Sequence, residues 1–268
     1  MSLDAPPSAS GTPAAPPESP RRARTFLGRL AQAVREQSWF AVALEVCIVV
    51  LGVVIGFQVN AWGNERATRA QERELLRGLR SEFVANLALY DRTAARHRYV
   101  RERALEFLQL IGPEPVLDDT ARIDTLIVTM TGEIPMYHPA MGEVEAMLGA
   151  GQLGIVRDDS LRTALASWPG ILDLLQEVEQ EHRGDVLNHL WPYIVGKTPL
   201  GAVNGTNRFP RRHDVLLSDI AFENHVGNRG AMVDEILEVG VPVRALLVQM
   251  IGQIDRQLGV QPHESEVL

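Results

Sequence analysis

The sequence contains almost no lysine and almost no cysteine, and each scarcity excludes a class of protein. Lys197 is the only lysine among the 26 lysine and arginine residues, and this arginine bias is typical of a GC-rich bacterial genome. The 268 residues carry a net charge of −8 and no block of basic residues interleaved with aromatics, so nucleic acid is not an expected partner. The single cysteine, Cys47, excludes an intrachain disulfide.

The sequence also lacks the short motifs of the common enzyme classes. It has no serine nucleophile elbow, no Walker loop and no dinucleotide fingerprint. His182, Asp185 and His189 are spaced i, i+3, i+7, so on a helix they share one face and form a donor set that zinc accepts. A polar helix face or a buried histidine pair gives the same spacing, which differs from the i, i+4 pair of helical zinc hydrolases. We therefore expect no enzyme, no cofactor and no catalytic residue, and keep these three as weak metal candidates.

Two further features near the middle of the chain bear on chemistry. Glu143 and Glu145, close to His138, stand two positions apart and would point away from each other on a helix, which disfavours an acid–base pair. The glycine-rich stretch 149–154 allows two interpretations. It either wraps an anion at the N-terminus of the following helix, or it is a tight connection whose glycines adopt positive φ.

A nearly unbroken apolar run lies between Trp39 and Trp62 and contains thirteen Val, Ile, Leu and Phe residues. A hydrocarbon core of roughly 30 Å needs about 20 helical residues, and these side chains contribute about −4 to −8 kcal/mol to insertion. Glu45 opposes insertion by at most about 3 kcal/mol, so residues 39–62 are predicted to form a transmembrane helix. Because the run is too long for a removable signal peptide, it predicts a retained signal anchor and a single-pass protein in the lipid bilayer.

One face of this helix carries small and polar residues. At about 100° per residue, Glu45, Gly52 and Gly56 fall close to one line, with Asn60 near its edge. The Gly52 and Gly56 spacing lets two helix backbones approach closely, which predicts a membrane-helix interface and a homo-oligomer. Glycine is also frequent in membrane helices without an interface, so the alternative stays open. Glu45 either finds a partner inside the bilayer or lies at the headgroup level.

The rest of the sequence is predicted to be all-α, because apolar residues recur at three-to-four spacing and strand-like alternation is absent. The predicted segments are a disordered Pro/Ala-rich tail (1–20), a short basic amphipathic segment (21–38), the transmembrane helix (39–62), a stalk helix that continues it (63–112), a helical bundle packed with the stalk (113–260) and a tail (261–268).

Caps and prolines set the expected helix limits within the bundle. Helices are predicted over about 118–130, 140–148, 161–191, 215–227 and 229–258, with a long loop over 196–214. Asp118 or Asp119 caps the first of these helices, and Asp158 lies in the cap of the third. Pro169 is expected to kink or restart the third helix, and Pro242 to bend the last.

Arginines flank both ends of the apolar run, so the positive-inside rule does not decide the orientation by count alone. The arginines before the run are barely diluted by acids, whereas Glu65, Glu72 and Glu74 interleave with those after it. This asymmetry favours a cytoplasmic N-terminus and a periplasmic C-terminal domain, in the inner membrane of a bacterium.

Two stretches resemble a known family. The first matches E-x-x-x-V-x-x-G-x-x-x-G-x-Q-V-N-x-W from Glu45 to Trp62. The second spans Tyr137 to Leu165, and its part from Met147 onward resembles L-x-S-G-x-L-x-x-I-x-D-x-x-L-R-x-x-L, with weaker similarity from Leu216 to Leu258. Both are similar to an uncharacterised family of bacterial single-span membrane proteins with a C-terminal all-helical domain of unknown function. Gly63 stands where that family usually has Asn, and Ala150 where it often has Ser. The resemblance implies a membrane-anchored helical domain and carries over no catalytic residue.

Taken together, these patterns predict a non-catalytic, membrane-anchored helical module for interaction or ligand sensing, which oligomerises through its transmembrane face. An unidentified membrane or periplasmic protein would be its partner, since the segment before the anchor holds no output domain. Two alternatives stay open: an accessory subunit of a membrane complex, and a membrane-tethered metal-dependent enzyme.

Overall fold

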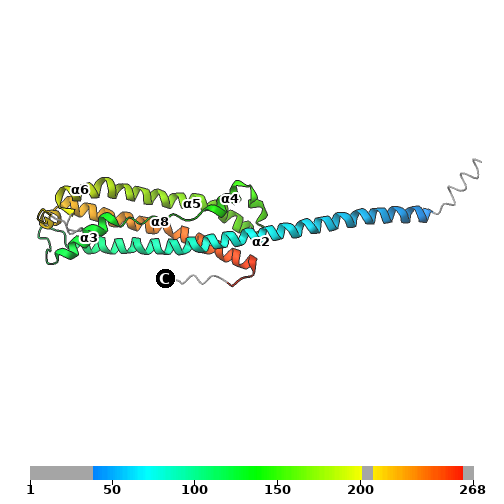
Figure 1. Cartoon of the computed structure of the whole chain (residues 1–268), viewed down its shortest axis with the longest axis horizontal. Helices are drawn as coiled ribbons and strands as arrows, with labels where there is room; N and C mark the ends of the chain where they lie inside the picture. The colour runs from blue at the N-terminus through cyan, green and yellow to red at the C-terminus, as the bar shows by residue number, and fades with distance from the viewer. Residues whose placement is uncertain (1–38, 201–207, 262–268) are drawn as a thin grey trace, which may run out of the picture. The chain divides into compact units, whose positions relative to one another are not determined.

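The computed structural model describes residues 39–200 and 208–261, and over these ranges the chain is built from helices without a strand (Figure 1). The all-α prediction is therefore confirmed. The expectations for residues 1–38, for 201–207 within the predicted loop and for most of the tail after residue 261 lie outside the described residues. The chain divides into two compact units, one that ends at Glu65 and one that begins at Arg66.

The first described helix, α2, is continuous from Trp39 to Leu108 and spans 70 residues. No proline interrupts this stretch, and its second part repeats apolar residues at helical spacing, so local sequence and packing both favour the helix. The predicted continuation of the apolar helix into the stalk is thus present in one element. Among the described residues, α2 is the one helix long and apolar enough to cross a membrane.

The second unit packs the later part of α2 with helices from the C-terminal half of the chain. These elements are α3 (Thr120–Gly132), α4 (Gly142–Gly149), the 3₁₀ helix η1 (Gln152–Ile155), α5 (Asp159–Asp185), the π-helix η2 (Val186–Leu190), α6 (Trp191–Lys197), α7 (His213–Leu217) and α8 (Ile220–Leu258). In Figure 1, α5 runs beside the later part of α2 in the same direction and α8 returns in the opposite direction.

Two apolar clusters hold this bundle together. One joins α2, α4, α5 and α8 around Phe83 and Trp168, whose rings meet edge to face with centroids 6.0 Å apart. The other joins α2, α3, α6 and α8 around Phe107 and Phe222, with centroids 5.2 Å apart in the same arrangement. Since aromatic side chains bury large apolar areas, these pairs fix how the long helices pack.

Helix limits follow the predicted caps in two places. Asp119 accepts hydrogen bonds from the N–H groups of Ala121 and Arg122 at the start of α3. Asp158 does the same for Ser160 and Leu161 at the start of α5. Each cap satisfies backbone donors that the first helical turn leaves free.

The expected division into helices 215–227 and 229–258 is wrong. The structure has a short α7 (His213–Leu217) and then a single α8 from Ile220 to Leu258. Gly227 and Asn228 are weak helix formers, but the next two residues, Arg229 and Gly230, are buried against neighbouring helices. Tertiary packing thus keeps the helix intact where local propensity predicts a break.

Pro169 does not restart α5, and α8 likewise continues through Pro242. Trp168 and Leu172 are buried on either side of Pro169 and anchor both of its neighbouring turns in the core. The lost backbone hydrogen bond is therefore offset by packing.

Candidate functional site

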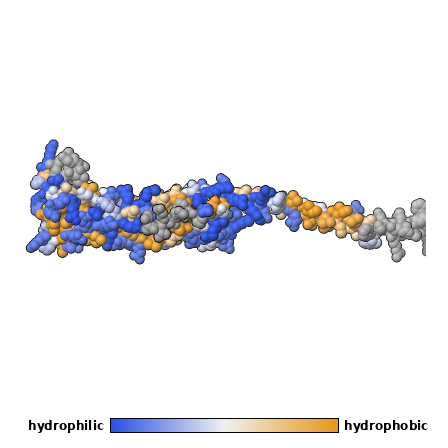
Figure 2. Space-filling view, turned by 90° about the horizontal axis from the view of Figure 1, so that it is seen from below, coloured by the Kyte–Doolittle hydropathy of each residue, from blue (hydrophilic) through white to orange (hydrophobic). Residues whose placement is uncertain are grey.

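The four residues predicted to form a membrane-helix interface, Glu45, Gly52, Gly56 and Asn60, all lie in the exposed part of α2. A Cβ atom added at either glycine would meet no other atom within 4 Å. Apolar side chains around the same stretch are exposed as well, Phe57 to 72% of its area, and they form a continuous hydrophobic surface (Figure 2). Within the described chain no residue covers this surface, so the interface with a second helix stays a prediction.

A row of arginines follows the apolar stretch on α2: Arg69, Arg73, Arg77 and Arg80. Steps of four, four and three residues place them along one side of the helix. Two grooves open beside this row, and both also involve the C-terminal end of α8. Arg73 lines both of them. We call them the first and the second arginine groove.

The first arginine groove has a volume of about 450 Å³. Its lining includes Arg69 and Arg73 from α2, Arg157 from the segment before α5, and Gln257 from α8. The Nε2 atom of Gln257 is buried and has no hydrogen-bond partner within the described ranges. The carboxylate of Glu72 also lines the groove, where it accepts the Arg157 backbone N–H at 2.9 Å and lies 3.4 Å from Arg157 Nε.

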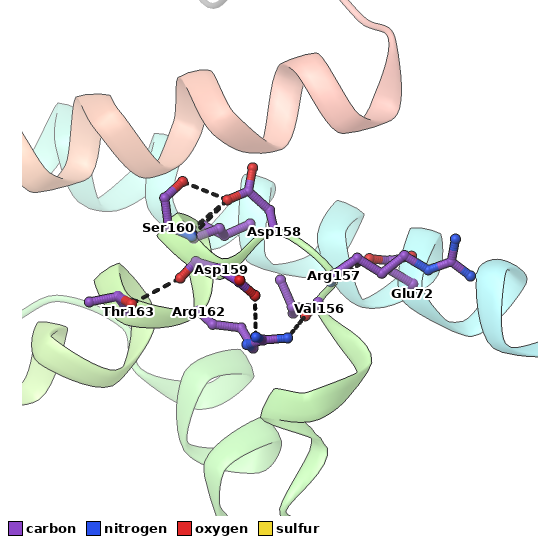
Figure 3. A network of polar contacts seen from close by, with 9 residues as sticks. Glu72, Val156, Arg157, Asp158, Asp159, Ser160, Arg162 and Thr163 are labelled. Atoms are coloured by element: carbon purple, nitrogen blue, oxygen red, sulfur yellow. Dashed lines mark hydrogen bonds and ion pairs between the residues drawn. The ribbon is translucent and has the colours of Figure 1, made fainter.

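A polar network fixes the wall of the first arginine groove at the start of α5 (Figure 3). Asp158 accepts the Ser160 and Leu161 N–H groups, and the Ser160 hydroxyl donates to the same carboxylate oxygen at 2.5 Å. The Gln253 amide of α8 donates to Ser160 Oγ at 2.8 Å and links the two helices. The hydrogen bond from Ser160, followed by that from Leu161, lowers the pKa of Asp158. The Asp158 carboxylate is therefore ionised at neutral pH and engaged in the cap.

The second arginine groove is larger, about 860 Å³, and has a mixed lining. Arg73, Arg77 and Arg80 line one side, and the apolar residues Val84, Leu258 and Val260 also contribute. No aspartate or glutamate lines it within the part of the chain that the structure describes. The groove therefore combines positive charge with apolar surface.

The chain reversal after α8 builds part of this lining. Gly259 ends the helix in the left-handed conformation with φ of 67°, which glycine adopts without strain. The Val260 N–H then donates to the Asp255 carbonyl at 3.1 Å, so the chain turns back over the last helical turn. This turn places Val260 in the second arginine groove.

The arginines of the row differ in how firmly they are held. Arg80 Nε lies 2.5 Å from Oδ1 of the buried Asp255 and ties α2 to α8. Arg77 pairs with Glu74 at 2.9 Å, but both side chains are largely exposed, so the pair is weak. Arg73 is exposed and has no ion pair or hydrogen bond to another described residue. Positive charge in the grooves is thus partly free to meet a ligand.

The three weak metal candidates do not converge. His182 is fully buried, while His189 is exposed. The π-helix that begins after Asp185 widens the turn between the two histidines, so the i, i+7 spacing no longer places them on one face. Within residues 39–200 and 208–261, no three His, Cys, Asp or Glu side chains are arranged to hold a metal ion.

His182 instead belongs to a buried contact with Arg229. The Arg229 guanidinium donates through Nη1 to His182 Nε2 and through Nη2 to the Glu133 carbonyl. Burial, together with the neighbouring positive charge of Arg229 and with His97, lowers the pKa of His182 to about 3. Burial lowers the pKa of Arg229 to about 10, against the opposing influence of Asp185 and Glu133. At neutral pH the imidazole is therefore neutral and the guanidinium charged.

A second buried polar cluster lies beside it and was not predicted from the sequence. Glu179 accepts the Tyr137 backbone N–H at 2.8 Å, and its other oxygen lies 3.4 Å from His97 Nε2. The adjoining cavity has only about 10 Å³, room for one water at most, so it holds no ligand. The available signal was the position of His97, which follows Tyr90 and Ala94 at helical spacing on the apolar face of α2.

Two sequence features noted above remain: the glutamates of α4 and the glycine-rich stretch 149–154. The Glu143 carboxylate lies over Gly78 of α2, where an added Cβ would come within 2.7 Å of it. The Glu143 N–H donates to the Glu82 carboxylate at 2.8 Å, near the start of α4. In the stretch 149–154, Gly151 alone adopts positive φ, 65°, between α4 and η1. This geometry is that of a tight connection between helices.

No family model, curated protein or solved structure matches this chain significantly. The resemblance to the uncharacterised single-span family therefore stays a prediction that depends on the residues of the anchor.

Proposed function

We propose that this chain is a single-pass protein of the bacterial inner membrane, whose helical domain serves as a non-catalytic interaction or ligand-sensing module. The observation that supports the anchor is the apolar first part of α2, which is exposed on every side. Thirteen large apolar side chains in water are unfavourable, and a bilayer removes them from water at a gain of about 4 to 8 kcal/mol. No other part of the described chain covers these side chains.

The proposed orientation has the N-terminus in the cytoplasm and the helical domain in the periplasm. Because Cys47 is the only cysteine, Cys47→Ser gives a cysteine-free background for topology mapping. Single cysteines at Arg24→Cys and Arg98→Cys, on either side of the anchor, are then treated with a membrane-impermeant maleimide in intact cells. We expect labelling at position 98 only. Labelling at position 24 only would show that the orientation is the opposite one. If neither position were labelled in intact cells but both were labelled after lysis, residues 39–62 would not cross the membrane.

The proposed oligomer forms through the face that contains Gly52 and Gly56. Leucine at both positions blocks close approach of two backbones without reducing the hydrophobicity of the helix. Cross-linking in native membranes should therefore trap a dimer or higher oligomer of the unmodified chain and lose it in Gly52→Leu/Gly56→Leu. The matched control is Val50→Leu/Val54→Leu on the opposite side of the same helix, which should keep the oligomer. Equal cross-linking of both double variants would exclude this face.

An interaction partner can be identified by co-purification. Purification of the full chain in a mild detergent should recover it as a homo-oligomer if it acts as an independent module. Recovery of a second protein in fixed stoichiometry would instead make it an accessory subunit of a membrane complex.

A further inference from the structure

Not all arginines of the two arginine grooves form ion pairs that stabilise the fold. Arg80 is needed to pair the buried Asp255, but Arg73 has no partner among the described residues and Arg77 has only an exposed one. An exposed i, i+3 pair such as Arg77 and Glu74 contributes little to stability, so a ligand with higher charge density can displace it. Two guanidinium groups, each with several N–H donors, are therefore available on one side of α2.

The acceptors near these guanidiniums are already engaged. In the first arginine groove, Glu72 binds the Arg157 backbone and side chain, and Asp158 caps α5. The Gln257 Nε2 group remains buried without an acceptor within the described ranges. The positive end of the α5 dipole also lies at this groove. Within this groove the exposed guanidinium of Arg73 has no acceptor among the described residues, and an oxyanion would supply one.

The apolar lining of the second arginine groove distinguishes between kinds of oxyanion. Val84, Leu258 and Val260 contribute surface that a small inorganic anion cannot use. An anionic phospholipid carries a phosphate next to its glycerol and acyl groups, so it matches both the guanidiniums and the apolar residues. The row begins at Arg69, seven residues after Trp62 at the end of the apolar run.

We propose that the two arginine grooves bind the phosphate group of anionic phospholipids, with Arg73 and Arg77 as the principal phosphate ligands. Guanidinium and phosphate form paired, charge-assisted hydrogen bonds, which are the strongest contacts that this surface offers. The apolar residues of the second arginine groove contact the glycerol and the first acyl carbons. The sensing role proposed above then has a ligand class, an anionic lipid, and the inference rests on that proposed role.

The test titrates the full chain in a non-ionic detergent with dihexanoyl phosphatidic acid, dihexanoyl phosphatidylcholine and inorganic phosphate, with binding followed by calorimetry. We expect saturable binding of phosphatidic acid that weakens as salt is raised. Arg73→Gln/Arg77→Gln should weaken it at least about tenfold, because two charge-assisted contacts are lost. Arg73→Gln alone should give part of this loss.

The matched control is Arg92→Gln/Arg98→Gln, which removes the same charge from exposed positions later on α2 and should bind like the unmodified chain. Equal weakening in both double variants would reduce the effect to net charge and overturn the proposal. Phosphatidylcholine or inorganic phosphate binding as tightly as phosphatidic acid would also overturn it, since apolar contact or free phosphate would then suffice. Because the titration is performed in detergent, its failure is distinct from a failure of the membrane anchor, which fractionation detects.

Discussion

The packing of α8 on α2 leads to a sharp prediction at Gly240. A Cβ atom placed on this residue would run into the Tyr90 hydroxyl of α2 and lie 3.2 Å from Tyr90 Cζ and 3.3 Å from Cε2. Tyr90 has little space to retreat, because it is 7% exposed, its ring meets that of Tyr137 edge to face at 5.4 Å, and the cavity beside it has only about 10 Å³. The close approach of the two helices thus depends on the missing side chain at Gly240.

Gly240→Ala combines two opposing effects. Alanine stabilises a helix interior by about 0.8–1 kcal/mol relative to glycine, whereas overpacking a core costs about 1–3 kcal/mol. The control is Gly227→Ala in the same helix, where the new Cβ meets no atom within 4 Å. We expect Gly227→Ala to stabilise by up to about 1 kcal/mol and Gly240→Ala to lie about 1–3 kcal/mol below it.

The assay is thermal unfolding of the purified full chain in detergent, followed by far-ultraviolet circular dichroism. For a domain of this size, 1 kcal/mol shifts the midpoint by about 2–4 °C. Tyr90→Phe removes the hydroxyl that the new methyl group meets, so Tyr90→Phe/Gly240→Ala should recover much of the loss. If Gly240→Ala stabilised the chain as much as Gly227→Ala, the reasoning about this helix contact would be refuted.

Three further predictions concern buried and capping groups. Stability should decrease as pH falls from 6.5, the ordinary pKa of His182, towards about 3, its pKa in the folded chain, because the unfolded chain binds a proton that the folded chain does not. The slope from this residue is at most about 1.4 kcal/mol per pH unit, and His182→Gln should reduce it in thermal melts; an unchanged slope would contradict the assignment. Asp158→Ala should lower the free energy of unfolding by about 1 kcal/mol, whereas Asp158→Asn, which still caps α5, should lose little; equal losses in denaturant titrations would argue against the cap. Glu179→Ala should cost about 1–3 kcal/mol because the buried Tyr137 N–H loses its acceptor, and Glu179→Gln should cost less in the same titrations; the reverse order would exclude this role.

Features encoded over a few residues were predictable from the sequence. The apolar run, the unbroken helix that follows it and the caps at Asp119 and Asp158 all depend on neighbours within a turn or two. Helix continuity across Gly227 and Asn228 was missed, because it depends on burial of the next turn against other helices.

The candidate site was also beyond sequence reasoning. The arginines after the anchor were visible, but the grooves combine α2 with the end of α8, and the first one adds the segment before α5, all far apart in the chain. The shared face of His182 and His189 was predicted with a regular helical repeat, and the π-helix after Asp185 changed that repeat. The buried pairing of His182 with Arg229 depends on packing between α5 and α8, which no local pattern specifies.

The proposed function depends on residues 39–62 holding this chain in a lipid bilayer. The direct measurement is alkaline carbonate extraction of membranes from cells that produce the full chain, with quantification of the intact polypeptide in pellet and supernatant. We expect the intact chain to stay in the pellet and to be released only by detergent. Recovery of the intact chain in the detergent-free supernatant as a dispersed monomer would contradict it.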